Sequence, residues 1–493
     1  RGVGTDLMPS NKDILEAQRF NRRRLIAAFS SGTPGGKEVD APNNLRPLLV
    51  GAVIAALILI VAAVMGRFSP TLPQGWENST MIVIKSSGAR YYMIDGTLRP
   101  VTNITSARLL SEAGSYKTSR VSASTIEGLP RGSQVGITGI PDDIPSSSAL
   151  HSDEWMSCAL EGGTHTWVAG KPEGTSNAGL ALVTSANRQY LISGGTRYLL
   201  DTTGTLGPAR SLGLDQVTPI EVEAAWLDLF VKGSDLAPLS IDDAGQPATN
   251  MPERLKSARI GTIIEVRDEA KEKSPSRAYI VTGDGRIASL SSVARRMYEL
   301  SDAYQKAGNP LSATIADIQD LGGNETFGPA DWPSTINIDE VVNTDSVPCA
   351  NLVLSATGAR TELLSMNARE ARRAASGAAS TTNASATEVP TGSQTEGKTG
   401  SQTEGKTEPL SSVTVRGGSG ALVRASSGGT LGATMFISDI GRAHGLGENP
   451  ADAIARLSWT DKDVVSVPSA WTKLVEPGED MTAEAVWTTV GVQ

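Results

Sequence analysis

The residues with the most recognisable chemical spacing form two copies of the octapeptide GSQTEGKT, at residues 392–399 and 400–407. Each copy satisfies the G-x4-G-K-[ST] pattern of a phosphate-binding loop, in which backbone amides hold the phosphates and the lysine reaches the outer phosphate groups. The matching residues are Gly392, Gly397, Lys398 and Thr399 in the first copy, and Gly400, Gly405, Lys406 and Thr407 in the second. A working loop of this kind would bind a nucleoside triphosphate.

The segments around the two copies lack the elements that a phosphate loop needs. A buried strand must deliver the loop and a helix must follow it, because the helix N-terminus faces the anion. The flanking segments read NASATEVPT and EPLSS, and neither has the periodicity of a strand or a helix. We therefore interpret the repeat as a duplicated polar octapeptide and expect no cofactor, with ATP hydrolysis as the alternative.

Other chemical residues are scattered along the chain. The three histidines, His151, His165 and His444, have no ligand spacing such as HExxH, so we expect no metal site and place all three on the polar surface. No G-x-S-x-G nucleophile motif is present. The sequence therefore predicts no catalytic residue.

One apolar run divides the chain. Residues 48 to 66, from Leu48 to Gly66, contain no charge, and as a helix they would cover roughly 28 Å, close to the thickness of a bilayer's hydrocarbon core. A buried globular helix rarely runs this far without a polar face. A cleaved signal peptide would have a shorter apolar region, whereas 47 residues precede this run. We predict an uncleaved transmembrane anchor.

Charge predicts which side of the membrane each part occupies. Residues 1–47 contain eight basic and five acidic residues, and basic residues next to a span stay in the cytoplasm. The remainder contains 36 basic and 48 acidic residues, so its net charge of −12 disfavours nucleic acid as a partner. We expect a cytoplasmic N-terminus, a single membrane span and a body outside the cytoplasm.

The two cysteines, Cys158 and Cys349, both belong to the predicted exported part. Export permits a disulfide, and neither cysteine has a CxxC neighbour that would suggest zinc or redox exchange. A single disulfide is the expected outcome, and two separate buried thiols are the alternative.

The N-terminal tail contains a predicted helix from Ser10 to about Phe29, which Ser-Ser-Gly ends. Its apolar stripe is interrupted by Arg22. The basic cluster Arg22, Arg23 and Arg24 is expected to contact anionic lipid or an acidic partner, or to act only as a topology signal. Residues 31–47 have the composition of a linker.

A short pattern recurs four times after the span. Each copy has an apolar strand, a glycine-centred turn, a second strand and a small residue that opens a short helix. Two-residue hairpin turns need positive φ, which suits Asp95-Gly96 and Asp284-Gly285. The copies occupy residues 90–110, 189–214, 278–294 and 421–442.

Several further motifs stand out: FNRRR at residues 20–24, YYMIDGTLRPVTNITSARLL at 91–110, VPSA at 467–470, LVEPG at 474–478 and TAEA at 482–485. Together with the single apolar run, the four copies and the two cysteines, they resemble the EccB family, the single-span core subunit of the type VII (ESX) secretion system of actinobacteria. The resemblance covers nearly the whole chain. It implies a disulfide at the positions matching Cys158 and Cys349.

The resemblance also implies the architecture and the partners. The fold class would be α+β, with one N-terminal transmembrane helix and four small α/β repeat domains around a β-rich central domain. The partners would be EccC, EccD, EccE and the mycosin protease, with self-association through the exported domains. We expect a structural core subunit; an exported ATPase or hydrolase and a cell-wall-binding module are the alternatives.

The expected boundaries follow from the repeats and the resemblance. The tail is 1–47, the anchor 48–67, the repeats 80–140, 181–240, 260–325 and 413–462, and the central parts 141–180, 330–366 and 463–493. Residues 367–412 are rich in Ala, Ser, Thr and Gly, and we expect a disordered insertion there.

Overall fold

The computed structural model describes residues 11–31, 45–67, 72, 74–200, 207–267, 277–283, 285–355, 358–382 and 412–488. It divides into two compact units, Arg1–Thr71 and Leu72–Gln493. We describe each unit separately and refer to the second as the body.

The first unit contains two helices, α1 (Asn11–Ser31) and α2 (Leu45–Arg67). The segment Pro47–Val64 of α2 has a mean hydropathy of 2.9, and it is the one helix of the described residues that is long and apolar enough to cross a membrane. Helix α2 begins at Leu45, inside the segment 31–47 that we predicted to be a linker. Pro47 is accommodated because the first turn of a helix needs no backbone N–H donor.

The body contains four repeats that share one sheet topology. In repeats 2, 3 and 4 a three-stranded antiparallel meander is flanked by one strand parallel to its first strand and another parallel to its third. In repeat 1 the last of these strands is reduced to isolated parallel bridges, Leu98 to Arg131 and Val101 to Val135.

Repeats 1 and 2 come first along the chain of the body. Repeat 1 comprises β1 (Thr80–Ile84), β2 (Arg90–Ile94), β3 (Thr97–Pro100), α3 (Ile104–Leu110) and β4 (Lys117–Val121). Repeat 2 comprises β8 (Leu180–Ser185), β9 (Arg188–Ser193), β10 (Thr196–Leu199), α4 (Gly207–Ser211), β11 (Ile220–Glu221), α5 (Ala224–Leu227) and β12 (Val231–Lys232). The predicted turn in repeat 1 is present, because Asp95 and Gly96 have φ values of 49° and 73°.

Repeats 3 and 4 follow later in the chain. Repeat 3 comprises β13 (Ile263–Val266), β14 (Arg277–Val281), β15 (Ile287–Leu290), α6 (Ser292–Glu299), α7 (Asp302–Ala307), β16 (Leu311–Ala313), α8 (Ile315–Ile318) and β17 (Gly322–Thr326). Repeat 4 comprises β21 (Ala421–Ser427), β22 (Thr430–Ile437), β23 (Arg442–Gly445), α10 (Pro450–Arg456), β24 (Val465–Pro468), α11 (Ser469–Thr472) and β25 (Glu476–Pro477).

The predicted fourth copy of the pattern is wrong by one strand. In repeats 1 to 3 the matched hairpin joins the second and third strands of the meander, whereas residues 421–437 form the first hairpin, β21–β22. The equivalent hairpin in repeat 4 is β22–β23, and α10 follows it. The sequence favours the first hairpin because Gly428-Gly429 is a stronger turn signal than the connection between β22 and β23.

A six-stranded central sheet joins stretches from across the body. Its order is β20 (Ser412–Val415), β6 (Gly163–Val168), β5 (Trp155–Leu160), β18 (Ser346–Ser355), β19 (Gly358–Asn367) and β7 (Thr175–Asn177). Two expected boundaries are corrected by this pairing. Strand β20 pairs with β6 and therefore belongs to the central sheet, while β24 and β25 complete repeat 4.

The expected disordered insertion is also corrected at its start. Residues 368–382 form helix α9 (Ala368–Thr382), because Ala and Arg are strong helix formers and one side of the helix packs on the central sheet. Residues 383–411, which contain both GSQTEGKT copies, lie outside the described residues.

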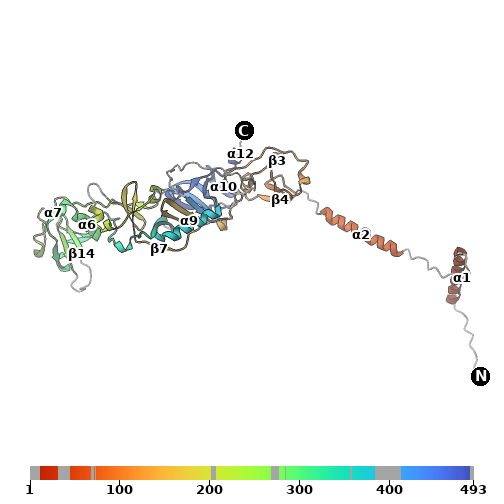
Figure 1. Cartoon of the computed structure of the whole chain (residues 1–493), viewed down its shortest axis with the longest axis horizontal. Coiled ribbons are helices and arrows are strands. Elements are labelled where there is room, and N and C mark those ends of the chain that lie inside the picture. The colour runs from red at the N-terminus through yellow and green to blue at the C-terminus, as the bar shows by residue number, and fades with distance from the viewer. Residues whose placement is uncertain are drawn as a thin grey trace, which may run out of the picture. The chain divides into compact units, whose positions relative to one another are not determined.

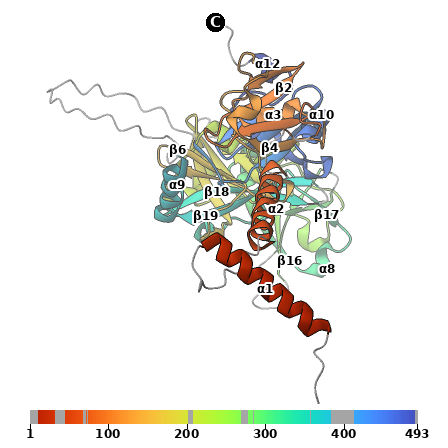
Figure 2. The same cartoon turned by 90° about the vertical axis from the view of Figure 1, so that its right-hand side faces the viewer.

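Shared apolar cores connect the modules of the body. One core joins the central sheet to repeats 2 and 4, a second joins repeats 2 and 3, and a third joins repeats 1 and 4. In Figure 1 the green repeat 3 lies beside the yellow-green repeat 2. Figure 2 shows β2 and α3 of repeat 1 next to α10 and the C-terminal helix α12 (Ala485–Thr488).

Candidate functional site

Of the predicted site residues, the structure describes the two cysteines and the arginine cluster of the tail. The residues of the phosphate-loop matches lie outside the described part of the chain. The three arginines Arg22, Arg23 and Arg24 are exposed on α1, where they can contact lipid or protein. Within the described ranges, no group of three or more His, Cys, Asp or Glu side chains could hold a metal ion.

The two cysteines form the disulfide Cys158–Cys349. They face each other on β5 and β18, two neighbouring antiparallel strands of the central sheet. Both are fully buried, together with Met156, Trp167 and Met366. The disulfide therefore joins chain segments 191 residues apart inside the sheet, which excludes the alternative of two separate thiols.

Two histidines are buried, contrary to the surface positions that we predicted. His444 in repeat 4 is fully buried, with Nε2 3.0 Å from Ser438 Oγ and Nδ1 2.8 Å from the carbonyl of Glu479. His165 on β6 is 4% exposed, with Nδ1 2.6 Å from Ser412 Oγ and Nε2 3.1 Å from Thr414 Oγ1. Hydrogen bonds to β20 thus replace the solvent around the His165 ring.

Burial lowers the pKa of His165 from 6.5 to about 4. Between pH 6.5 and pH 4 the unfolded chain therefore binds more protons than the folded body. The free energy of unfolding falls as the pH is lowered through this window. We expect His165 to contribute a loss of about 3 kcal/mol in the free energy of unfolding across that window. Burial lowers the pKa of His444 as well, so its contribution has the same sign.

Urea unfolding at a series of pH values measures this effect. A His165→Gln variant should lose less stability than the wild-type chain between pH 6.5 and 4, because glutamine does not titrate. Equal losses in the two proteins would contradict the assignment to His165. For each protein, the loss is measured relative to its own free energy of unfolding at neutral pH.

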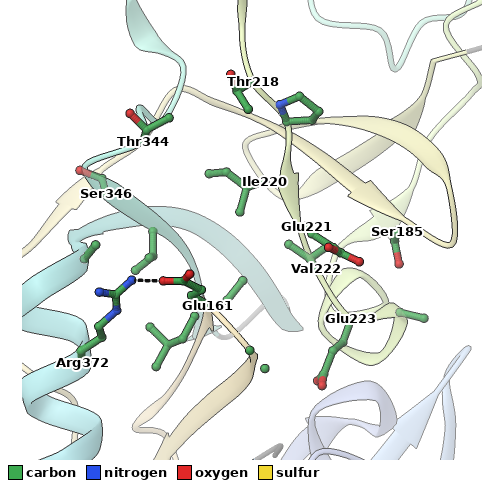
Figure 3. Close-up of a pocket in the computed structure, with 18 of the residues that line it drawn as sticks. Glu161, Ser185, Thr218, Ile220, Glu221, Val222, Glu223, Thr344, Ser346 and Arg372 are labelled. Atoms are coloured by element: carbon green, nitrogen blue, oxygen red, sulfur yellow. Dashed lines mark hydrogen bonds and ion pairs between the residues drawn. The ribbon is translucent and has the colours of Figure 1, made fainter. Parts of the chain in front are cut away.

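A groove of about 920 Å³ lies between the central sheet and repeat 2. It is lined by the β5–β6 turn, β11, the start of β18 and α9. Figure 3 shows the Glu161–Arg372 ion pair on one wall and Glu221 and Glu223 across from it. Its lining residues include neither His nor Cys, so the groove contains no nucleophile beside an imidazole base.

The contacts most relevant to a structural role lie where the modules meet. Thr361 of β19 donates its hydroxyl proton to the carbonyl of Leu229 in repeat 2 at 2.7 Å. The same oxygen accepts the indole N–H of Trp471, in α11 of repeat 4, at 3.2 Å. One buried threonine therefore connects the central sheet with two repeats.

A second contact of this kind connects repeats 1 and 4. The Arg456 side chain of α10 donates to the carbonyls of Leu109 and Ser111, at 3.1 and 2.8 Å. These carbonyls lie at the C-terminal end of α3, where a helix leaves acceptors unsatisfied. Sequence reasoning missed Thr361, Trp471 and Arg456, because each acts across more than 100 residues and no local motif marks it.

These features define a class of protein: a membrane-anchored chain with a single span and a disulfide-linked body of repeated α/β modules. Residues 7–491 match the family described as "Type VII secretion system ESX-1, transport TM domain B", so the chain belongs to the EccB family.

Curated relatives support this assignment. The chain is 29% identical over 315 residues to a protein named ESX-2 secretion system ATPase EccB2 of Mycobacterium tuberculosis (strain H37Rv), covering 60% of each. It is 26% identical over 307 residues to ESX-3 secretion system ATPase EccB3 of Mycolicibacterium smegmatis, covering 59% of this chain and 57% of that one. The chain thus matches less than two thirds of the length of these relatives.

Solved structures share the fold. One from "an intact ESX-5 inner membrane complex" gives a TM-score of 0.63 at 19% identity, covering 100% of this chain and 98% of that chain. The "EccB3 dimer from the ESX-3 core complex" gives 0.62 at 21% identity, covering 83% of this chain and 99% of that one. Both the resemblance to EccB and the α+β fold class are confirmed.

Proposed function

We propose that the chain is a structural core subunit of a type VII (ESX) secretion complex in the inner membrane. The observation that carries the proposal is the way the modules are joined: a central sheet with a buried disulfide, shared apolar cores and the Thr361 contact hold the body in one arrangement. Such a body can support other subunits without performing chemistry.

The proposed orientation and partners extend beyond the family assignment. The basic tail, with its exposed arginine cluster, would lie in the cytoplasm and contact EccC and EccD or anionic lipid. The body would lie in the periplasm, with EccE and the mycosin protease as further partners. Self-association through the body is supported by the solved structure of an EccB3 dimer.

ATP hydrolysis is the second candidate function, because the curated relatives are named ATPases and the chain contains two GSQTEGKT copies. The sequence flanking the copies provides no strand or helix, so we expect neither lysine to bind phosphate.

Deleting residues 392–407 tests this alternative. The purified full-length chain should show the same rate of phosphate release from ATP with and without the deletion. The double variant Lys398→Ala/Lys406→Ala should also match the wild-type rate, and it keeps the segment's length. A hydrolysis rate that disappears in both variants would identify a working phosphate loop and overturn the scaffold proposal.

A further inference from the structure

Helix α9 lies on the face of the central sheet that carries the disulfide. Ala371 of α9 is fully buried in the same apolar cluster as Cys158, Cys349 and Met366, and Ala374 and Ala375 pack against that cluster. The disulfide is therefore covered by a helix that belongs neither to the sheet nor to any repeat.

Helix α9 contacts the apolar cluster around the disulfide through alanine methyl groups. Residues three and four positions apart share one face of a helix, so Ala371, Ala374 and Ala375 form a single contact stripe. Side chains this small bury little apolar surface, and the free energy of burial scales with the area removed from water. The stripe shields the sulfur atoms but holds the helix weakly.

The ion pair between α9 and the β5–β6 turn is also exposed. The Arg372–Glu161 ion pair joins side chains that are 56% and 83% exposed, and exposed pairs contribute little. Ala368 and Arg372, near the start of the helix, line the groove. Further along the helix, Ala375 and Ser376 line a hollow of about 340 Å³ together with residues 160–165 and Ser412.

Helix α9 belongs to no strand pair, so its movement away from the central sheet would break none. Strand β19 ends at Asn367, α9 starts at the next residue, and the sheet resumes only at Ser412 with β20. At the start of α9, Ala368 N–H donates to the Asp345 carbonyl at 2.9 Å, and Arg369 N–H donates to the side-chain oxygen of Asn367 at 3.0 Å.

We propose that α9 is a removable cover that controls how fast thiol reductants reach the Cys158–Cys349 disulfide. With α9 displaced, the thiolate of a dithiol reductant attacks one cysteine sulfur, forms a mixed disulfide and releases the other cysteine as a thiolate. The second thiol of the reductant then displaces the first cysteine. Two electrons and two protons pass to the protein, which ends with two thiols, while the dithiol becomes a cyclic disulfide.

Reduction kinetics of the full-length chain test the proposal. Dithiothreitol is added in native buffer, samples are quenched with a maleimide-polyethylene glycol reagent, and the released thiols are counted by gel shift. Ala371→Gln places a larger side chain under the helix and should raise the reduction rate about tenfold. Arg372→Glu breaks the ion pair with Glu161 and should raise the rate about threefold.

Arg373→Glu is the matched control, because it makes the same charge change at an exposed position of the same helix. Its rate should stay within about twofold of the wild-type rate, as for a surface substitution. Equal rates in all four proteins, or an equal increase in Arg373→Glu and Arg372→Glu, would overturn the proposal.

Urea separates local opening from unfolding of the whole body. Displacement of one helix exposes little surface, so the reduction rate should change only slightly in dilute urea. A rate that rises steeply with urea in the wild-type chain would mean that reduction requires global unfolding, and α9 would then have no covering role.

Discussion

The Cys158→Ala/Cys349→Ala variant is expected to lose about 3 to 5 kcal/mol in the free energy of unfolding of the body. The disulfide closes a segment of 191 residues, and in the chain-entropy model such a loop corresponds to about 5 kcal/mol. Urea unfolding followed by tryptophan fluorescence measures the loss. All eight tryptophans lie between residues 76 and 487, so the signal reports only the body.

Two controls belong to this experiment. Each single variant, Cys158→Ala or Cys349→Ala, should lose a similar amount, because either one opens the same loop. The wild-type chain unfolded with reductant should approach the double variant. A double variant as stable as the oxidised wild-type chain would show that the sheet does not depend on the disulfide.

The Trp471→Ala variant should lose about 3 to 5 kcal/mol, the usual cost of deleting a fully buried tryptophan side chain. Trp471 packs edge-to-face on Trp155 of the central sheet, with ring centroids 6.2 Å apart. The same change also removes the hydrogen bond to Thr361. The measurement is again the free energy of unfolding from the fluorescence transition.

Milder variants separate packing from hydrogen bonding at this position. Trp471→Phe keeps an aromatic ring and should lose the hydrogen bond with part of the packing, so its loss should be smaller than that of Trp471→Ala. A double-mutant cycle with Thr361→Val should give a coupling of about 1 kcal/mol. Trp487→Ala, at a 47% exposed position, is the matched control and should lose less than about 1 kcal/mol. Equal losses at residues 471 and 487 would contradict the central role of Trp471.

The local elements of this fold were predictable from the sequence. The apolar run predicted α2 because its length matches a bilayer, and Asp95-Gly96 predicted a hairpin because both residues must adopt positive φ. The disulfide was predictable because only two cysteines exist. In each case the deciding residues are adjacent in sequence or unique in the chain.

The long-range pairings were not predictable in this way. Strand β20 pairs with β6 although His165 and Ser412 are 247 residues apart, and its four residues are too few to stand out from the polar sequence before them. The alanine-rich sequence of α9 is equally ambiguous, because alanine is common both in linkers and in helices. Packing on the sheet, which is not visible in the sequence, decides between the two.

The joined modules explain how a body with repeated small cores can act as one support. Each repeat shares an apolar core with a neighbour, and the central sheet collects strands from three separate stretches of the chain. Loads applied to one module would pass to the next through packed side chains. A structural subunit of a membrane complex requires this property.

Native electrophoresis of gently solubilised membranes tests the structural role most directly. The tagged full-length chain is expressed in a host that carries an ESX system, and the bands are probed for the tag and for EccC and EccD. We expect the tag to co-migrate with both at several times the mass of one chain. A tag that migrates only as a free chain or homodimer, without EccC and EccD, would contradict the scaffold proposal.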